Sequence, residues 1–198
     1  MKRIALIITC FIFAYTSYAQ TIKIDNGIST NSIKGERIDL FPNQIPSYSV
    51  LLGIEYFEKR WIYLSSEIGY IKLGGQEDGT LNGVPLKYKQ TWDYVHLNTS
   101  ARLRATTSKT EFYLGAGPYL NVLPGSGDFH DSFYDGYSTQ RINWGCKTEI
   151  GINGIINRFK SGLNCTYLLP FSPVFKSPYT SMNARSITVY FSIGYRLK

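Results

Sequence analysis

The chain has 198 residues, of which 43% are hydrophobic, so it fits one folded domain and is not a mainly disordered chain. Aromatic residues make up 15%, with 16 tyrosines and 18 glycines, against only 18% charged residues. This composition favours β structure. The formal net charge is +7, but no run of Lys and Arg is dense enough to predict a nucleic-acid partner.

The first residues have the pattern of a secretory signal peptide. Lys2 and Arg3 precede an apolar stretch over residues 4–15, and Ser17 and Ala19 put small residues at the two positions that a signal peptidase reads. The stretch is too short for a membrane-spanning helix. Lipidation at Cys10 fits less well, because the apolar residues continue beyond it. We expect a cleaved signal peptide over 1–19 and one domain over 20–198, with 19 basic and 14 acidic residues, a charge of +5.

The remainder of the chain alternates apolar and polar residues with a period of two, which predicts strands. The clearest segment runs from Ile187 to Leu197. No apolar stretch after residue 20 approaches the ~20 residues of a membrane helix, so a membrane form would have to be a barrel. Eight segments alternate, over residues 21–33, 47–57, 61–73, 92–105, 111–123, 142–155, 159–169 and 187–197.

The connections between these segments alternate strictly between short and long. Because alternate connections of a meander lie at opposite ends, the short ones share one end of the barrel. Outer-membrane barrels have short periplasmic turns and long extracellular loops. The expected short connections are 58–59, 106–109 and 157–158, and the long ones are 34–46, 74–89, 124–141 and 170–184.

One face of the predicted strands carries glycines, tyrosines and isolated charges, which suits a narrow lumen filled by side chains. Burying a charge is costly unless it is paired. We therefore predict that Glu67 and Glu149 contact basic neighbours, Arg102 first. The predicted polar network of the lumen consists of Glu55, Glu67, His96, Arg102, Arg104, Lys147, Glu149, Lys160 and Arg196.

The opposite face is apolar and suits lipid. Aromatic residues lie near its ends, where membrane barrels carry aromatic girdles: Tyr56, Tyr70, Trp144, Phe159 and Tyr195. A soluble periplasmic barrel that binds a small apolar ligand stays open as an alternative. Two cysteines, Cys146 and Cys165, fall on the apolar face, about four residues out of register, and are expected to be free thiols.

The end of the expected signal peptide at Ala19-Gln20, the eight amphipathic strands and the closing strand resemble small outer-membrane β-barrel proteins. The Bacteroidota-type outer-membrane β-barrel domain family is the nearest match, over residues 20–198. The resemblance implies an all-β, antiparallel, up-and-down transmembrane barrel in the cell outer membrane. It also implies that the insertion machinery reads the closing strand at Val189, Phe191, Ile193, Tyr195 and Leu197. The terminal Lys198 departs from the aromatic residue common there.

Signals for catalysis are weak. His130-Asp131-Ser132 has the residue types of a catalytic triad, but triad members meet through the fold and not by adjacency. His96 and Ser100 are roughly 13 Å apart along a strand, too far for a hydrogen bond. We therefore predict no enzyme, no cofactor, no metal ligand and no catalytic residue.

The sequence favours an outer-membrane barrel with a structural or interaction role and a plugged lumen. Its outer loops would contact lipopolysaccharide or an unidentified protein partner, through an aromatic-rich loop. A narrow channel is the alternative, although eight strands leave an interior that side chains just fill. The candidate loop surface consists of Phe129, His130, Phe133, Tyr134 and Tyr137.

Overall fold

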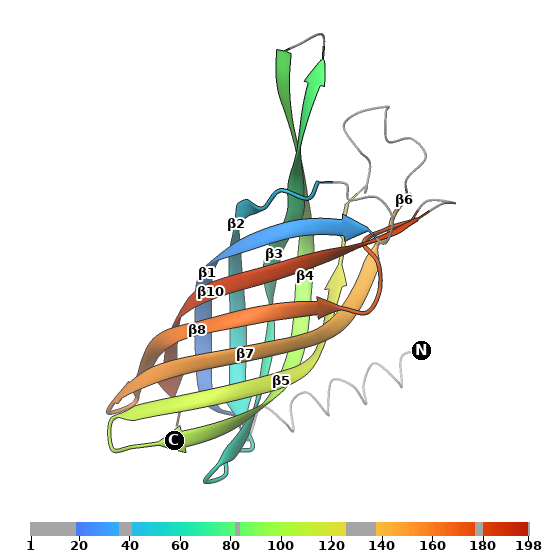
Figure 1. Ribbon diagram of the computed structural model, residues 1–198. Coiled ribbons are helices and arrows are strands. Elements are labelled where there is room, and N and C mark those ends of the chain that lie inside the picture. Colours follow the sequence, from blue (N-terminus) through green and yellow to red (C-terminus); the bar gives the residue numbers. More distant parts are fainter. Residues whose placement is uncertain (1–18, 36–40, 82–83, 126–137, 177–179, 198) are drawn as a thin grey trace, which may run out of the picture.

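The computed structural model describes residues 19–35, 41–81, 84–125, 138–176 and 180–197 (Figure 1). Two predictions lie outside these residues. One is the signal peptide over residues 1–19, of which all but Ala19 are undescribed. The other is the loop surface of Phe129, His130, Phe133, Tyr134 and Tyr137.

Eight long antiparallel strands form a closed barrel, which confirms the predicted fold class (Figure 1). Each strand pairs with its neighbour in sequence, and the last pairs with the first from Thr21–Arg196 to Gly35–Met182. None of the described residues forms a helix that is long and apolar enough to cross a membrane. The strands are β1 (Ala19–Gly35), β2 (Ile45–Tyr56), β3 (Ile62–Leu81), β4 (Val84–Thr106), β5 (Thr110–Val122), β7 (Ile142–Ile156), β8 (Phe159–Pro170) and β10 (Ser181–Arg196), and two short ones are β6 (Ser138–Thr139) and β9 (Phe175–Lys176).

Three short connections lie at one end of the barrel, which we call the turn end; the opposite end is the loop end. They cover residues 57–61, 107–109 and 157–158. Asn157 has a φ of 55°, a left-handed conformation that Asn tolerates better than most residues. This conformation lets β7 and β8 join through two residues.

The predicted long loop over 74–89 is wrong. Strands β3 and β4 continue in register through this segment as far as Leu81–Val84 and project beyond the barrel (Figure 1). We call this projection, residues 74–81 and 84–90, the β3–β4 ribbon. The intervening sequence Asn82-Gly83 is the strongest two-residue hairpin signal, which explains why the pairing does not stop at the rim. Strand β10 likewise begins at Ser181, inside the predicted loop over 170–184.

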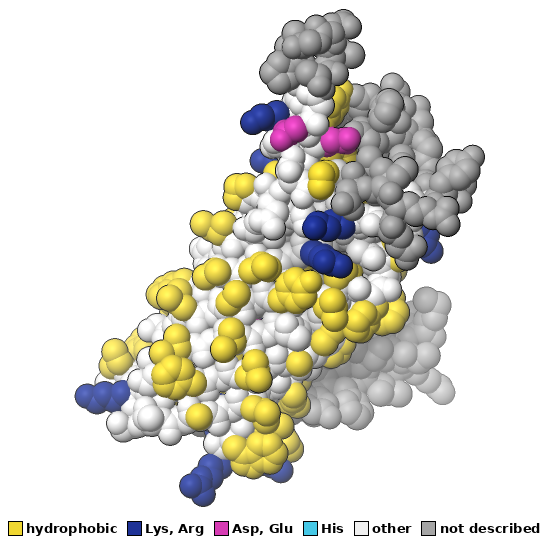
Figure 2. Space-filling model, in the orientation of Figure 1, with side chains coloured by type: hydrophobic (Ala, Val, Ile, Leu, Met, Phe, Trp, Pro, Cys, Tyr) yellow, Lys and Arg dark blue, Asp and Glu magenta, His cyan; other side chains and the backbone are white. Residues whose placement is uncertain are grey.

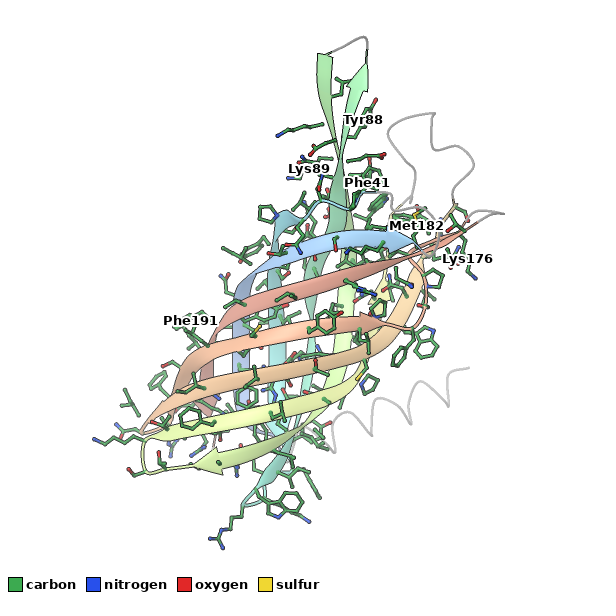
Figure 3. The ribbon with its side chains drawn as sticks, in the orientation of Figure 1. Phe41, Tyr88, Lys89, Lys176, Met182 and Phe191 are labelled. Carbon is green, nitrogen blue, oxygen red and sulfur yellow. The ribbon has the colours of Figure 1, made fainter. Side chains whose placement is uncertain are left out.

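Burial alternates along the strands as the polar and apolar residues do. In β10 the even-numbered residues are buried and the odd-numbered ones are exposed from Arg185 to Tyr195. Phe191 accordingly points away from the barrel (Figure 3). Figure 2 shows the result, a belt of hydrophobic side chains on the visible wall with Lys and Arg above and below it.

The lumen is divided into two halves of different chemistry. Its turn-end half contains ion-paired charges. Its loop-end half is a hydrophobic cluster. The buried residues of this cluster are Ile33, Phe41, Leu51, Ile71, Leu73, Trp92, Tyr94, Tyr119, Leu123, Leu168, Val174, Phe175, Met182, Ala184 and Tyr190.

Candidate functional site

Arg102 of β4 lies at the centre of the turn-end half. Its guanidinium donates to Glu149 of β7 at 2.7 Å from Nε and to Glu67 of β3 at 2.7 Å from Nη2. A third carboxylate, Glu55 of β2, lies 3.1 Å from Nη1. The planar guanidinium suits this role because its five donors can serve several carboxylates at once. One side chain therefore links three other strands across the lumen.

Glu67 is the second centre of the network. Besides Arg102, it accepts from Lys23 and Lys147, each at 2.5 Å, and from the Ser65 and Asn98 side chains. Lys23 also pairs with Asp25, and Lys147 lies 3.0 Å from Glu149. The carboxylate is 1% exposed, so these donors replace the water that it loses on burial.

A third group of pairs extends to the turn end. Lys160 of β8 contacts Glu55 at 2.8 Å and Glu111 at 2.6 Å. Arg104 then joins Glu111 to Glu58, at 3.3 and 2.9 Å. The network is thus continuous from the middle of the lumen to its rim.

The charges of the network nearly cancel. Five cations face six carboxylates, an excess of one negative charge. Removing one partner from a buried pair costs about 3–5 kcal/mol, because the other is left charged and unpaired. The cations are Lys23, Arg102, Arg104, Lys147 and Lys160, and the carboxylates are Asp25, Glu55, Glu58, Glu67, Glu111 and Glu149.

Glycine and tyrosine positions shape the space around the network. A Cβ at Gly115 would lie 2.7 Å from Glu149 Oε1 and 2.9 Å from Arg102 Cγ. The Arg102 guanidinium lies over the Tyr113 ring, 4.6 Å from its centroid, where a cation–π contact adds to the ion pairs. Small residues on one strand thus make room for large ones on the next.

The loop-end half closes the lumen by a different means. The rings of Trp92 and Phe175 pack with centroids 4.5 Å apart. Phe41 and Met182, which are 1% and 0% exposed, lie beside them at the loop end (Figure 3). His96 lies below this cluster, with Nδ1 2.5 Å from Asn121 Oδ1 and its ring stacked on Tyr119.

Little space is left between the side chains of the network. A cavity of about 10 Å³ lies beside Lys23, Glu55 and Arg102, about enough for a single water molecule. Within the described ranges, no three His, Cys, Asp or Glu side chains meet as metal ligands. The ion pairs of the site therefore connect strands across the lumen.

A groove of about 630 Å³ interrupts the apolar belt on the outer wall. Residues of β1 to β5 line it, among them Ser66, Thr99 and Pro118 together with several leucine and isoleucine residues. The hydroxyls of Tyr56, Ser66 and Thr99 form a hydrogen-bonded row, with distances of 3.0 and 2.9 Å. These hydroxyls satisfy one another on an otherwise apolar surface.

The structure places most of the predicted lumen residues in one network. Glu67 and Glu149 both contact Arg102. Arg196 is half-buried at the end of β10, and no ion pair among the described residues includes it. Buried in the lumen are Glu55, Glu67, His96, Arg102, Lys147, Glu149 and Lys160, with Arg104 half-buried at the turn end.

The sequence interpretation missed Lys23, Asp25, Glu58 and Glu111. The first two lie at alternate positions of β1, in phase with its buried face, so the alternation alone could have identified them. Glu111 falls at the start of a predicted strand and Glu58 in a predicted turn, and the alternation gives neither of them a role. Their part depends on Arg104 and Lys160, which only the strand register brings near.

The outer wall carries the remaining predicted residues. Val189, Phe191, Ile193 and Tyr195 are exposed on β10, and Leu197 follows the strand. Cys146 and Cys165 are free thiols on adjacent strands, each opposite a different residue, Leu169 and Ile150.

Comparison with solved structures shows that the fold is that of small outer-membrane barrels. Neisserial surface protein A is similar over 89% of this chain and 97% of its own, with a TM-score of 0.52 and 13% identity. Outer membrane protein AlkL, solved in lipid bilayers, is similar over 91% of this chain and 92% of its own, with a TM-score of 0.51 and 12% identity. No curated protein and no protein-family model matches the chain, so the Bacteroidota-type family is not confirmed. The chain thus has the eight-stranded antiparallel fold of outer-membrane barrels.

Proposed function

We propose that the chain is a non-conducting, non-catalytic barrel of the outer membrane that presents its loop end to a partner. The observation that carries this proposal is the filled lumen: ion pairs occupy the turn-end half and packed apolar side chains the loop-end half. A channel needs a continuous wet path, and the described side chains of the lumen fill the interior in both halves. The apolar belt supports the membrane placement, because a soluble barrel would expose these side chains to water.

The β3–β4 ribbon is the described surface best suited to contact a partner. Its base is covered, with Gly74, Gly75 and Gln90 buried, but farther out Leu86, Lys87, Tyr88 and Lys89 are all exposed where the ribbon projects beyond the barrel (Figures 1 and 3). An isolated two-stranded ribbon is marginally stable, but this one continues from barrel strands. We propose lipopolysaccharide or a protein as its partner, together with the aromatic-rich loop of Phe129, His130, Phe133, Tyr134 and Tyr137.

Two measurements test this function. Cell fractionation should place the protein in the outer membrane, with gel mobility that changes on boiling. The purified folded barrel in planar bilayers should give no unit currents. A soluble periplasmic location would overturn the membrane placement and return the ligand-binding barrel to first place. Unit currents altered by Glu67→Gln would instead identify a channel through the lumen.

A further inference from the structure

Basic side chains surround the turn end of the barrel. Each of the three short connections carries at least one exposed cation: Lys59 and Arg60 between β2 and β3, Lys109 between β4 and β5, and Arg158 between β7 and β8. Figure 2 shows Lys and Arg at this end of the molecule, below the hydrophobic belt. We call these four residues the turn-end ring.

The ring has no counter-ion of its own among the described residues. The two carboxylates at this end, Glu58 and Glu111, are 7% and 0% exposed and are held by Arg104. The loop end differs, because acidic residues are interleaved there and Lys72 pairs with Asp93. The exposed positive charge of the turn end is therefore available to an external anion.

The barrel fixes the backbone of the ring. The Lys59 carbonyl accepts from the Arg104 guanidinium at 2.6 Å, and the Lys109 carbonyl accepts from the Ile155 amide at 2.8 Å. The Arg158 carbonyl accepts from the Arg196 amide at 2.7 Å. Cations held at fixed positions lose less conformational entropy on binding than cations on a free loop.

Outward aromatic residues indicate the depth of the ring. Phe57 and Trp61 flank Lys59 and Arg60, and Phe159 follows Arg158. These three side chains are 55%, 60% and 59% exposed on the outer wall. Aromatic side chains of membrane proteins gather where headgroups meet the acyl chains. In the proposed membrane placement, these aromatic residues put the ring at the level of lipid phosphates.

We propose that the turn-end ring binds the phosphates of anionic phospholipids and selects them over zwitterionic lipids in the adjacent leaflet. This inference rests on the proposed membrane placement. Each Lys or Arg near an anionic surface increases lipid attraction roughly fivefold, and the attraction is screened by salt. Four exposed cations, three of them on backbone that the barrel holds, should therefore enrich anionic lipid around the turn end.

Two tryptophans report on the two ends of the barrel. Trp61 lies at the turn end and Trp144 lies on the outer wall towards the loop end, whereas Trp92 is buried in the lumen and serves as constant background. The protein would be placed in nanodiscs that contain brominated phosphatidylglycerol or, at equal fraction, brominated phosphatidylcholine. Trp144→Phe isolates the quenching of Trp61, and Trp61→Phe isolates that of Trp144.

We expect the anionic lipid to quench Trp61 about twofold more than the zwitterionic lipid at low salt, with the excess lost near 1 M salt. The combined variant Lys59→Gln, Arg60→Gln, Lys109→Gln and Arg158→Gln should abolish the excess. A matched variant at the loop end, Lys34→Gln, Arg141→Gln, Lys176→Gln and Arg185→Gln, removes the same charge and should retain it. The salt titration of the unaltered protein gives an independent readout if a variant does not fold.

The outcomes separate this inference from the proposed function. Equal quenching of Trp61 by both lipids would overturn the ring's selectivity but leave the barrel in the membrane. If both charge variants lost the excess quenching of Trp61 equally, the excess would come from the net charge of the protein, and the proposed selectivity of the turn-end ring would be wrong. If neither lipid quenches either tryptophan, the membrane placement itself fails.

Discussion

The two halves of the lumen fill the same kind of space with opposite chemistry. In the turn-end half, Arg102 and Glu67 each contact several partners from other strands. In the loop-end half, Trp92, Phe175 and Met182 pack in an apolar cluster. Loss of one partner leaves a buried charge unpaired and lowers the free energy of unfolding strongly. In an apolar cluster, the loss of stability depends instead on the side-chain volume that is removed. The polar half should therefore fix which strands pair, while the apolar half tolerates replacement by similar volumes.

The largest expected effect is that of Arg102→Met. This change leaves Glu55, Glu67 and Glu149 without their shared cation, so the free energy of unfolding should fall by about 5 kcal/mol. Urea unfolding in detergent micelles measures the loss. Arg104→Met is the milder control: Glu111 keeps Lys160, and Glu58 at the rim keeps only the Thr21 hydroxyl, so the free energy of unfolding should fall by about 2 kcal/mol. Equal losses would mean that Arg102 is not the centre of the network.

Trp92→Ala tests the apolar half. The cavity left beside Phe175 should lower the free energy of unfolding by about 3 kcal/mol. Trp92→Phe keeps most of the side-chain volume, so the free energy of unfolding should fall by only about 1 kcal/mol. The same unfolding assay applies. If Trp92→Phe proved as damaging as Trp92→Ala, the cluster would depend on specific contacts and the contrast between the halves would weaken.

Gly115→Ala adds volume to the polar half. Its Cβ would press on Glu149 and Arg102, so we expect a loss of about 2 kcal/mol. Gly154→Ala is a matched control on the next strand, because its nearest contact would be the Ser161 carbonyl at 3.7 Å. The difference in urea midpoint between the two variants measures how tightly the network is packed. No difference would show that the network can move aside.

Lys72→Met should have the smallest effect. The Lys72–Asp93 pair is 3.4 Å long and its side chains are 35% and 57% exposed, so water already solvates both charges. The free energy of unfolding should change by less than about 0.5 kcal/mol. Such a result would separate the buried pairs from the exposed one. A loss comparable to that of Arg102→Met would contradict the role given to burial.

The period-two alternation was enough to predict the strands and the inward charges. It assigns Arg102, Lys147 and Glu149 to the lumen because each lies in phase with buried neighbours on its own strand. It could not predict the pairs themselves, since Arg102 and Glu149 belong to strands that are not adjacent. Such contacts depend on barrel width and register, which no single strand encodes.

The β3–β4 ribbon shows a different limit. Glycines and charges in Gly74–Asp78 resemble a loop when the barrel is expected to end at its rim. Strand residues that extend beyond the barrel wall, such as the exposed residues 86–89, need no apolar alternation, so the pattern that identifies barrel strands is lost there. The Asn82-Gly83 sequence was the signal that remained.

The seam between β1 and β10 has a consequence for the order of folding. It pairs Thr21 with Arg196 and continues to Gly35 with Met182, so this edge of the first strand stays unpaired until the last strand is in place. Contacts between such distant residues are slow to form. Before closure, β1 and β8 would each present an edge of unpaired amides and carbonyls, which hydrocarbon does not accept. In a bilayer a partly folded barrel is therefore not a stable intermediate, and the barrel becomes stable only when β10 pairs with β1 and β8.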